Sequence, residues 1–528
     1  MSNVRSSPSR RDFLKLAALA PAGIAAQPLL RTPAPQRQQG DGRQNVLVVV
    51  FDALSASNVP MYGYGRNTTP NLAALAKRAI VYHRHLAGGN FTTPGTASLL
   101  TGTLPWTNRA MAPGAGVSQR FVTRNLFTAF ADYHRTAYAH TAWAYTLLRQ
   151  FRHQIDELIP RETLLLASYA TVVQAAFTAD QDAASVSWER VLRSDKYGYA
   201  YSLFLSRLQQ ALLADKVPLA LQQAYPRGVP LAGGDAFLLE HAVDWISELL
   251  LKAPQPYIGY FHFFPPHAPY NTSAEFYNWF SGDNFRPIRK PTDAFSLPKP
   301  PDLLRSRREY DEYVLYADRE FGRLYESLSS SGMLENTWLV VTSDHGELFE
   351  RGFVGHGSDS LYQPVIHIPL MIFEPGRRTG MDIHSPTSAV DVLPTLAHVT
   401  GRPVPDWCEG AVLEPFAASR ADVDREVFSV RSTKTGPESP LSRASIVLVR
   451  GQYKLHYYVG YPDRGFEELV KLYDLDADPE ELEDLSTSRK DIAAELLDAL
   501  KRKLAEVNQP YMKAAALPTS SDRMEELS

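Results

Sequence analysis

Unbroken apolar runs recur along this 528-residue chain, and each has the length of a strand. The first, NVLVVVFDAL at residues 45–54, is rich in valine and ends in Asp52. A run that is apolar at every position is typical of a parallel strand buried on both faces. Four further runs share this pattern: TAYAHTAW (136–143), PYIGYFHFF (256–264), TWLVVTSDHGE (337–347) and IPLMIFEPG (368–376).

Segments with a helical pattern separate these runs. The clearest are TPNLAALAKRAIVY (69–82), AFLLEHAVDWISELLL (236–251) and RREYDEYVLYADREFGRLYESLSSSG (307–332). Strands that alternate with helices predict an α/β fold with a sheet flanked by helices on both faces. Ligands bind such sheets at the carboxyl ends of the strands. Asp52, Asp344 and His345 stand where apolar runs end, so two distant segments bring them to one edge.

The C-terminal part of the chain has a different pattern. Alternating strands in ASIVLVRGQYKLHYYVG (444–460) predict a hairpin, and an amphipathic helix follows at residues 490–507. We therefore predict a main domain over residues 44–415 and a smaller antiparallel α+β subdomain with a tail over residues 416–528. Residues 150–235 are helix-forming and lack a chemical motif, so we interpret them as a helical insertion in the main domain.

Residues 1–43 are interpreted as an export signal and linker rather than as part of the fold. Arg10 and Arg11 precede an Ala-rich apolar run, which resembles a twin-arginine signal. The predicted location is therefore outside the cytoplasm: periplasmic, extracellular or anchored to a membrane by an uncleaved signal. The alternative is an amphipathic N-terminal helix with two ordinary arginines.

Composition narrows the classes of partner. The formal net charge of −4 gives no bulk electrostatic case for nucleic acid, so we expect no nucleic-acid partner. Cys408 is the single cysteine, which excludes intrachain disulfides and cysteine metal clusters. A small-molecule or polymer-end substrate remains. The oligomeric state is not predicted.

Several short motifs occur in one order along the chain. They are VFDAL, TTPNLAALA, TTPGTASLLTG, HFFPPHAPY, SDHGELFERGFVGHG, DVLPTLAHVTG, and GQYKLHYY followed by LYDLDADPEELEDL. In this order and spacing the chain resembles the sulfatase family of the alkaline phosphatase superfamily, over residues 44–510. The resemblance implies a large α/β catalytic domain and a smaller C-terminal four-stranded sheet with a helix.

The family's nucleophile motif is Cys or Ser, any residue, then Pro-Ser-Arg, with Leu-Leu-Thr-Gly further on. The resemblance places Thr92 at the nucleophile and Pro94 at the proline, whereas Gly95 and Thr96 replace the Ser-Arg pair. Sulfatases convert the Cys or Ser to formylglycine, and threonine is not a known substrate for that conversion. Relatives that keep a threonine transfer phosphoryl groups directly. Thr93 is the rival nucleophile, and both hydroxyls could instead cap a helix.

A threonine hydroxyl needs a metal or a base to become a good nucleophile. Asp52, Asp344 and His345, with Thr92, are the predicted ligands of one divalent metal ion. Calcium-dependent sulfatases carry Asp-Asn where this chain has Asp344-His345, so calcium remains a candidate. The imidazole favours manganese or zinc.

Three further histidines stand in these motifs. His267 matches the family histidine that contacts the transferred group or protonates the leaving oxygen, and His356 is placed in the substrate pocket as a donor or general acid. His262 is interpreted as a core or supporting histidine. Thr141 and Trp143 occupy positions where sulfatases usually have lysine and histidine, which argues against a standard sulfate pocket.

Three hypotheses of function follow from this pattern. The preferred one is an exported, metal-dependent hydrolase or transferase of phosphoester groups, with Thr92 as the covalent nucleophile and Asp52, Asp344 and His345 as metal ligands. The second is a sulfuric ester hydrolase that acts without formylglycine. The third is a non-catalytic binding protein that keeps only the fold and the metal.

Overall fold

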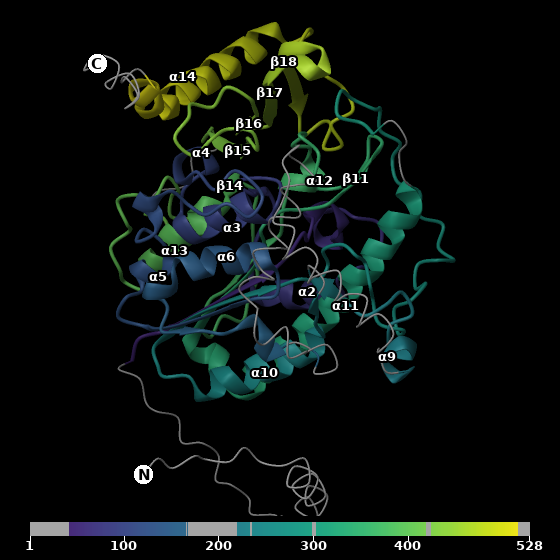
Figure 1. Cartoon of the computed structure of the whole chain (residues 1–528). Coiled ribbons are helices and arrows are strands. Elements are labelled where there is room, and N and C mark those ends of the chain that lie inside the picture. The colour runs from purple at the N-terminus through teal and green to yellow at the C-terminus, as the bar shows by residue number, and fades with distance from the viewer. Residues whose placement is uncertain are drawn as a thin grey trace, which may run out of the picture. The chain divides into compact units, whose positions relative to one another are not determined.

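A mixed eight-stranded sheet forms the centre of the structure (Figure 1). The computed structural model describes residues 42–164, 166, 219–232, 235–297, 302–418 and 424–515. The strand order is β13 (Met381–Ile383), β2 (Ile80–Tyr82), β12 (Leu370–Phe373), β9 (Thr337–Ser343), β1 (Asn45–Phe51), β8 (Tyr257–Phe263), β4 (His134–Ala139) and β5 (Glu157–Leu158). β1 runs parallel to β8 and β9, and β12 is antiparallel to both β9 and β2. All five predicted strands are present.

Helices cover both faces of this sheet, because its central strands are apolar at every position. Along β1, Val48 packs into one apolar layer and Val49 into the other. The first layer contains side chains of α3 (Thr92–Thr101), α6 (Ala142–Gln150) and α13 (Val392–Val399), and the second those of α10 (Leu239–Lys252) and α11 (Leu303–Ser330). Figure 1 shows the two groups of helices on opposite sides of the sheet. The predicted architecture is confirmed.

One predicted helix ends earlier than expected. The segment 69–82 forms α2 only over Pro70–Leu75, continues as a short 3-10 turn, and then becomes strand β2. Ile80 and Val81 are buried, and β2 is paired on one side with β12 and on the other with β13. Two β-branched side chains in a buried sheet favour the strand, so pairing with distant segments overrides the local helical pattern.

A second sheet of four antiparallel strands lies in the C-terminal part, as predicted. Its strands are β15 (Val427–Arg431), β16 (Ala444–Arg450), β17 (Tyr453–Tyr461) and β18 (Phe466–Asp474). Leu496 and Leu500 of α14 (Lys490–Ala515) pack on one face against Leu448. Val447, the preceding residue, packs on the other face against Val365 of α12 (Gln363–Ile366). The sheet is therefore covered on both sides, and one cover belongs to the main domain.

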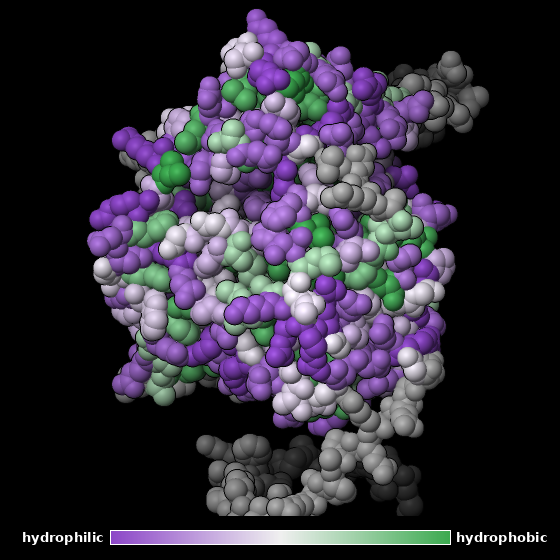
Figure 2. Space-filling view, turned by 180° about the vertical axis from the view of Figure 1, so that it is seen from behind, coloured by the Kyte–Doolittle hydropathy of each residue, from purple (hydrophilic) through white to green (hydrophobic). Residues whose placement is uncertain are grey.

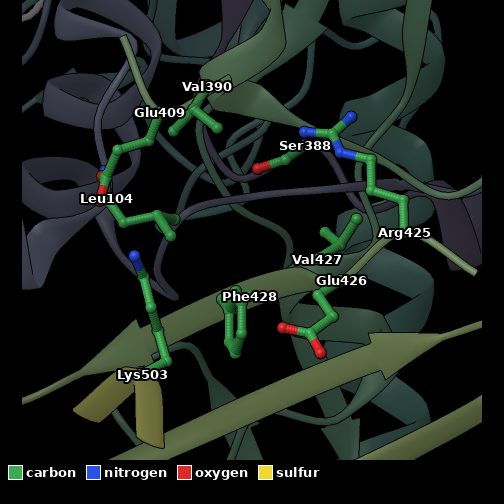
Figure 3. Close-up of a pocket in the computed structure, with 9 residues that line it drawn as sticks. All are labelled: Leu104, Ser388, Val390, Glu409, Arg425, Glu426, Val427, Phe428 and Lys503. Carbon is green, nitrogen blue, oxygen red and sulfur yellow. The ribbon is translucent and has the colours of Figure 1, made fainter. Parts of the chain in front are cut away.

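A cavity of about 250 Å³ marks part of the seam between the two sheets (Figure 3). Its charged side chains already have partners. Arg425 donates to both carboxylate oxygens of Asp391, at 2.8 and 2.6 Å, and Glu409 accepts from the backbone N–H of Leu104 at 2.6 Å. Lys503 lies 3.0 Å from a carboxylate oxygen of Glu506. We therefore interpret this cavity as a packing gap at the seam.

Some predictions about domains are not tested. Residues Gly40–Ser528 form one compact unit, so the boundary at 415/416 stays a prediction. Most of the expected insertion at 150–235 and nearly all of the export signal lie outside the described residues. None of the described helices is long and apolar enough to span a membrane. The face shown in Figure 2 is mostly polar, with apolar residues in small scattered groups.

A buried ionic cluster joins the C-terminal sheet to the main domain. Glu481 is fully buried, lies 2.7 Å from the ammonium of Lys454 and 2.9 Å from His456, and accepts from the Gln363 backbone N–H at 2.7 Å. Burial lowers the pKa of Lys454 to about 8. Although burial opposes its ionisation, Lys454 and His456 hold the pKa of Glu481 well below its usual range. Each charge is therefore sustained by its partner.

We predict that Glu481→Gln lowers the free energy of unfolding by about 3 to 5 kcal/mol, because it leaves the Lys454 ammonium buried without a counter-charge. Urea denaturation would measure the loss. Glu468→Gln is the matched control, since Glu468 of the same sheet pairs with Lys501 of α14 at 2.8 Å and both side chains are about half exposed. That change should cost at most about 1 kcal/mol. Equal losses in the two variants would contradict the prediction.

Candidate active site

Two strands end side by side and bring three candidate metal ligands together. Phe51 of β1 is paired with Ser343 of β9, so Asp52 and Asp344 follow at the same level of the sheet. One ligand atom each of Asp52, Asp344 and His345 lies within 4.8 Å of the others, and all three side chains have no exposed surface. Among the described residues this is the one group of its kind. The structure thus assembles the predicted ligand set, apart from Thr92.

The atoms that face one another in this group have no hydrogen-bond partner. They are both carboxylate oxygens of Asp52, Oδ2 of Asp344 and Nε2 of His345. The other oxygen of Asp344 accepts from the backbone N–H groups of Ala53, at 3.2 Å, and His345, at 3.0 Å. Buried polar atoms without partners are costly, whereas a cation bound between them would satisfy all of them at once. The donor set therefore fits a divalent metal ion.

The imidazole of His345 is held with one nitrogen directed at the carboxylates. Its Nδ1 lies 2.8 Å from the Gly346 carbonyl oxygen, which accepts a hydrogen bond from Nδ1–H, so Nε2 is the nitrogen that faces the carboxylates. Burial disfavours the charged imidazole, but Asp344 and Asp52 outweigh this effect and raise the pKa of His345 to about 9. Burial, followed by the charge of Asp52, raises the pKa of Asp344. The site concentrates negative charge and attracts a cation.

His262 is closer to this site than the sequence suggested. It lies on β8, it has no exposed surface, and its Nε2 is 3.5 Å from Asp52 Oδ2 and 3.6 Å from Asp344 Oδ2. Its Nδ1 lies 3.1 Å from the Tyr260 hydroxyl, while Nε2 has no hydrogen-bond partner. His262 is therefore a direct neighbour of both carboxylates. Its position in the middle of an apolar run had favoured the core interpretation.

Thr92 and Thr93 begin helix α3, and their hydroxyl groups differ in their contacts. The Thr93 hydroxyl accepts a hydrogen bond from the Gly114 backbone N–H at 3.0 Å. The Thr92 side chain is buried, and its hydroxyl makes no hydrogen bond within the described part of the chain. Neither hydroxyl caps the helix, since Phe91 is the N-cap residue. The hydroxyl that remains available is thus that of Thr92.

Contacts on either side of Thr92 tie it to the rest of the site. A Cβ atom on Gly95 would lie 2.0 Å from the Asp344 carbonyl oxygen, so α3 runs directly against the metal-ligand segment. Asn90 donates to the carbonyl oxygens of His356, at 3.2 Å, and Ser358, at 2.8 Å. The residues that flank Thr92 in the chain therefore contact the Asp344 segment and the His356 segment.

His267 and His356 lie beside His345 as a cluster of three imidazoles. The ring centroid of His356 is 4.3 Å from that of His345 and 4.8 Å from that of His267. Nδ1 of His267 lies 2.6 Å from the Ala268 carbonyl oxygen, so Nε2 is the nitrogen left to face a ligand. The structure brings both predicted histidines to the metal-ligand set.

Glu347 is a site residue that the motif analysis missed. Its side chain is fully buried, and Oε1 lies 2.8 Å from Nδ1 of His356. Burial raises the pKa of Glu347 to about 7, against the opposing charges of His267 and His345. The carboxyl group fixes the orientation of the His356 ring, leaving Nε2 on the other side. The acid after the Asp-His-Gly sequence was the available signal.

A hairpin carries Glu347 and His356 at its open end. β10 (Leu348–Glu350) pairs with β11 (Phe353–Gly355), and the next residue outward on each strand is Glu347 and His356. The turn is held from two sides: Arg351 stacks 3.9 Å above the Tyr362 ring of the main domain and donates to the Glu481 carbonyl oxygen of the C-terminal part at 2.5 Å. The C-terminal part thereby helps to place His356.

The predicted pocket positions Thr141 and Trp143 lie at the start of α6. Trp143 packs its ring edge-on against Phe91, with centroids 6.2 Å apart, next to the candidate nucleophile. Thr141 is the N-cap residue of α6 and makes no side-chain capping bond. His140, which the motif comparison left out, is fully buried and accepts from the Phe264 backbone N–H at 3.1 Å. Trp143 is thus the one of the pair that packs beside the Thr92 segment.

Comparisons with known proteins agree with this geometry. The Sulfatase family model matches residues 44–402, and the model described as N-sulphoglucosamine sulphohydrolase, C-terminal, matches residues 355–510. Choline-sulfatase of Rhizobium meliloti (strain 1021) is 25% identical over 476 residues, covering 84% of this chain and 83% of that protein. The multifunctional alkaline phosphatase superfamily protein PehA of Trinickia caryophylli is 23% identical over 499 residues, covering 84% of this chain and 91% of PehA.

A solved structure shares the fold. Phosphonate monoester hydrolase of Agrobacterium radiobacter matches with a TM-score of 0.64 at 18% sequence identity. The match covers 88% of this chain and 96% of that one. Both sheets lie within the ranges that the two family models match.

We predict that Gly95→Ala weakens metal binding by about 10- to 100-fold, because the added methyl group would displace the backbone of Asp344. Isothermal titration with Mn²⁺ would measure the affinity. Gly282→Ala serves as the control, since a Cβ atom there meets nothing within 4 Å. Wild-type affinity in Gly95→Ala would show that the contact between α3 and Asp344 does not shape the metal site.

Proposed function

This chain belongs to the sulfatase family, and from that premise we propose that it hydrolyses or transfers a phosphoester group with Thr92 as the nucleophile. Family membership supports a sulfatase-like hydrolase of the alkaline phosphatase superfamily. The proposal adds the ester class, the nucleophile and the metal dependence. It is carried by one observation: the Thr92 hydroxyl has no hydrogen-bond partner in the described chain, while its chain neighbours Asn90 and Gly95 contact the His356 and Asp344 segments.

Threonine at this position favours direct attack over the formylglycine route. Its Cβ carries a methyl group, so oxidation of the side chain could not give an aldehyde. An unmodified hydroxyl can instead form a covalent phosphoester when it is activated. Thr92 stands at the N-terminus of the ten-residue helix α3, where the helix dipole favours an anionic group. The local field therefore suits a negatively charged ester.

Asp52, Asp344 and His345, together with Thr92, would hold the metal ion. A bound divalent cation would lower the pKa of the Thr92 hydroxyl and neutralise the oxygens of the ester. The imidazole in this donor set favours manganese or zinc, with calcium as the alternative. His262 faces the same two carboxylates and adds a second imidazole beside them.

The proposed reaction has two steps, both carried by side chains of this chain. Thr92 loses its hydroxyl proton to solvent, its Oγ1 forms a bond to phosphorus, and the bond from phosphorus to the leaving oxygen breaks. Nε2 of His267 or His356 gives that oxygen a proton. Water or an acceptor alcohol then attacks phosphorus and gives its proton to that histidine, the bond from phosphorus to Oγ1 breaks, and Oγ1 takes up a proton from solvent, which restores the Thr92 hydroxyl. Glu347 keeps His356 oriented through the 2.8 Å contact with Nδ1.

The relatives include both kinds of ester chemistry by name. One is a choline-sulfatase, another is called multifunctional, and the structural match is a phosphonate monoester hydrolase. Hydrolysis of a sulfuric ester without formylglycine is therefore the second candidate function. A non-catalytic binding protein is the third. The joint presence of unpaired ligand atoms at Asp52, Asp344 and His345, with His267 and His356 beside them, argues against it.

We predict turnover of a bis-aryl phosphodiester in the presence of manganese, with a covalent adduct on Thr92 detected by peptide mass spectrometry. Thr92→Ala should abolish turnover and the adduct but keep metal binding. Thr93→Ala is the matched control, because its hydroxyl only accepts from Gly114; turnover should persist, at a stability cost of about 1 kcal/mol.

An aryl phosphomonoester and an aryl sulfate complete the substrate panel. Faster turnover of the aryl sulfate, without an adduct on Thr92, would favour hydrolysis of sulfuric esters over the proposed phosphoester reaction. Full activity of Thr92→Ala would remove Thr92 from the mechanism. Metal binding without turnover of any of these esters would favour the binding protein.

A further inference from the structure

A second cavity, of about 350 Å³, opens beside the first turn of helix α11. It shares no lining residue with the candidate active site. Its walls come from α11, from the segment 280–287, and from one residue near the N-terminal end of the main domain. Five arginines line it: Arg66, Arg286, Arg305, Arg307 and Arg308. Whether this cavity can bind an anion depends on how many of the five guanidinium charges are neutralised by carboxylates.

Three of the five arginines have carboxylate neighbours. Arg66 lies 2.7 Å from Asp283 and 2.7 Å from Asp311, and Arg305 lies 2.9 Å from Glu309. Arg307 has a longer contact of 3.9 Å with Glu350. These pairs build the wall of the cavity and hold it in shape.

Arg286 and Arg308 form no ion pair with any described residue. Arg286 donates only to the neighbouring Phe285 carbonyl oxygen, at 3.0 Å. Arg308 has a buried Nε without a hydrogen-bond partner. Arg307, whose exposed fraction is 8%, also has a buried Nε without a partner. Donors thus remain unsatisfied in the lining of the cavity.

The acids in the lining form their hydrogen bonds with Arg66 and Arg305, although the charge of Arg286 also acts on Asp283. Asp283 accepts two hydrogen bonds from Arg66, at 2.7 and 3.0 Å. Asp302 is the N-cap residue of α11 and accepts from the Arg305 backbone N–H at 3.0 Å. The start of this 28-residue helix adds the positive end of its dipole. The lining therefore offers a surplus of donors to an anion.

The remaining walls are apolar and rigid. Phe280 and Phe285 pack against the Arg66 guanidinium, with ring centroids 5.2 and 4.5 Å from it. Leu304 also lines the cavity and is 59% exposed. An apolar surface of this kind beside cationic donors can contact the organic body of an ester while the arginines bind its charged end.

We propose that this cavity binds a tetrahedral oxyanion, sulfate or phosphate, through Arg286, Arg307 and Arg308. Planar guanidinium groups match the oxygens of such anions and form charge-assisted hydrogen bonds to them. The anion is either the free ion or the charged end of an organic ester that uses the apolar wall. The site is independent of the proposed function, so the failure of one leaves the other standing.

Titration calorimetry with inorganic phosphate and inorganic sulfate tests the proposal. The Arg286→Gln/Arg308→Gln double variant should lose affinity by about tenfold or more relative to wild type. Arg289→Gln is the matched control, because Arg289 is exposed on the same segment but does not line the cavity. Binding at the candidate active site is common to all three proteins and cancels in the comparison. Circular dichroism would check that the double variant is folded.

Each outcome decides the question. Loss of phosphate and sulfate affinity in the double variant, with wild-type affinity in Arg289→Gln, supports the site. Unchanged binding in the folded double variant, or an equal loss in Arg289→Gln, overturns it. Phenyl phosphate then separates the two sources of the anion: tighter binding than inorganic phosphate, absent in the double variant, identifies an organic ester, and equal affinities identify the free ion.

Discussion

The enclosure of two carboxylates at adjacent strand ends is the constraint on which the rest of the site depends. Asp52 and Asp344 have no exposed surface, and their facing ligand atoms lie within 4.8 Å of each other. Two like charges this close in a protein interior repel strongly. Although burial opposes its ionisation, the nearby imidazoles of His267, His262 and His345 keep the pKa of Asp52 below its usual range. The same group attracts a divalent cation. The imidazoles thus offset part of the negative charge of the carboxylates, and the unpaired oxygens are placed to bind a cation that would offset the rest.

The second sheet contributes more than stability. In the segment that follows β18, the Glu481 carbonyl oxygen holds Arg351 at the turn of the β10–β11 hairpin, and the other end of that hairpin carries Glu347 and His356. The buried pair of Lys454 and Glu481 is part of the same connection, because the Glu481 carboxylate also accepts a hydrogen bond from the backbone N–H of Gln363 in α12. The position of a candidate proton donor in the main domain therefore depends on packing at the C-terminal sheet. This explains why the two sheets form one compact unit.

Membership in the sulfatase family leaves the ester class open, because its members share a charge arrangement rather than a substrate. In the proposed reaction, a divalent cation held by two carboxylates and an imidazole would stabilise a tetrahedral anion, whether its centre is sulfur or phosphorus. The distinguishing feature here is the side chain of residue 92, a threonine. The choice between the chemistries thus rests on one residue at the start of α3.

Sequence alone determined the main architecture, because the burial of a strand can be recognised from the residues of that strand. Continuous apolar runs identified the five central strands, and the ends of β1 and β9 placed Asp52, Asp344 and His345 at one edge. Alternation identified the strands of the second sheet. These patterns can be recognised without knowing which strands pair, since a strand buried on both faces must be apolar wherever it lies in the sheet.

Only the tertiary structure decided the finer contacts. Residues 80–82 became a strand because β12 and β13 flank them. His262 proved to face both carboxylates, and the Thr92 hydroxyl remained available because Gly114 bonds to Thr93 instead. Each of these outcomes depends on which distant segment lies opposite a side chain. Strand register and the path of the loops decide which segment lies opposite. The local alternation of apolar and polar residues does not encode either of them.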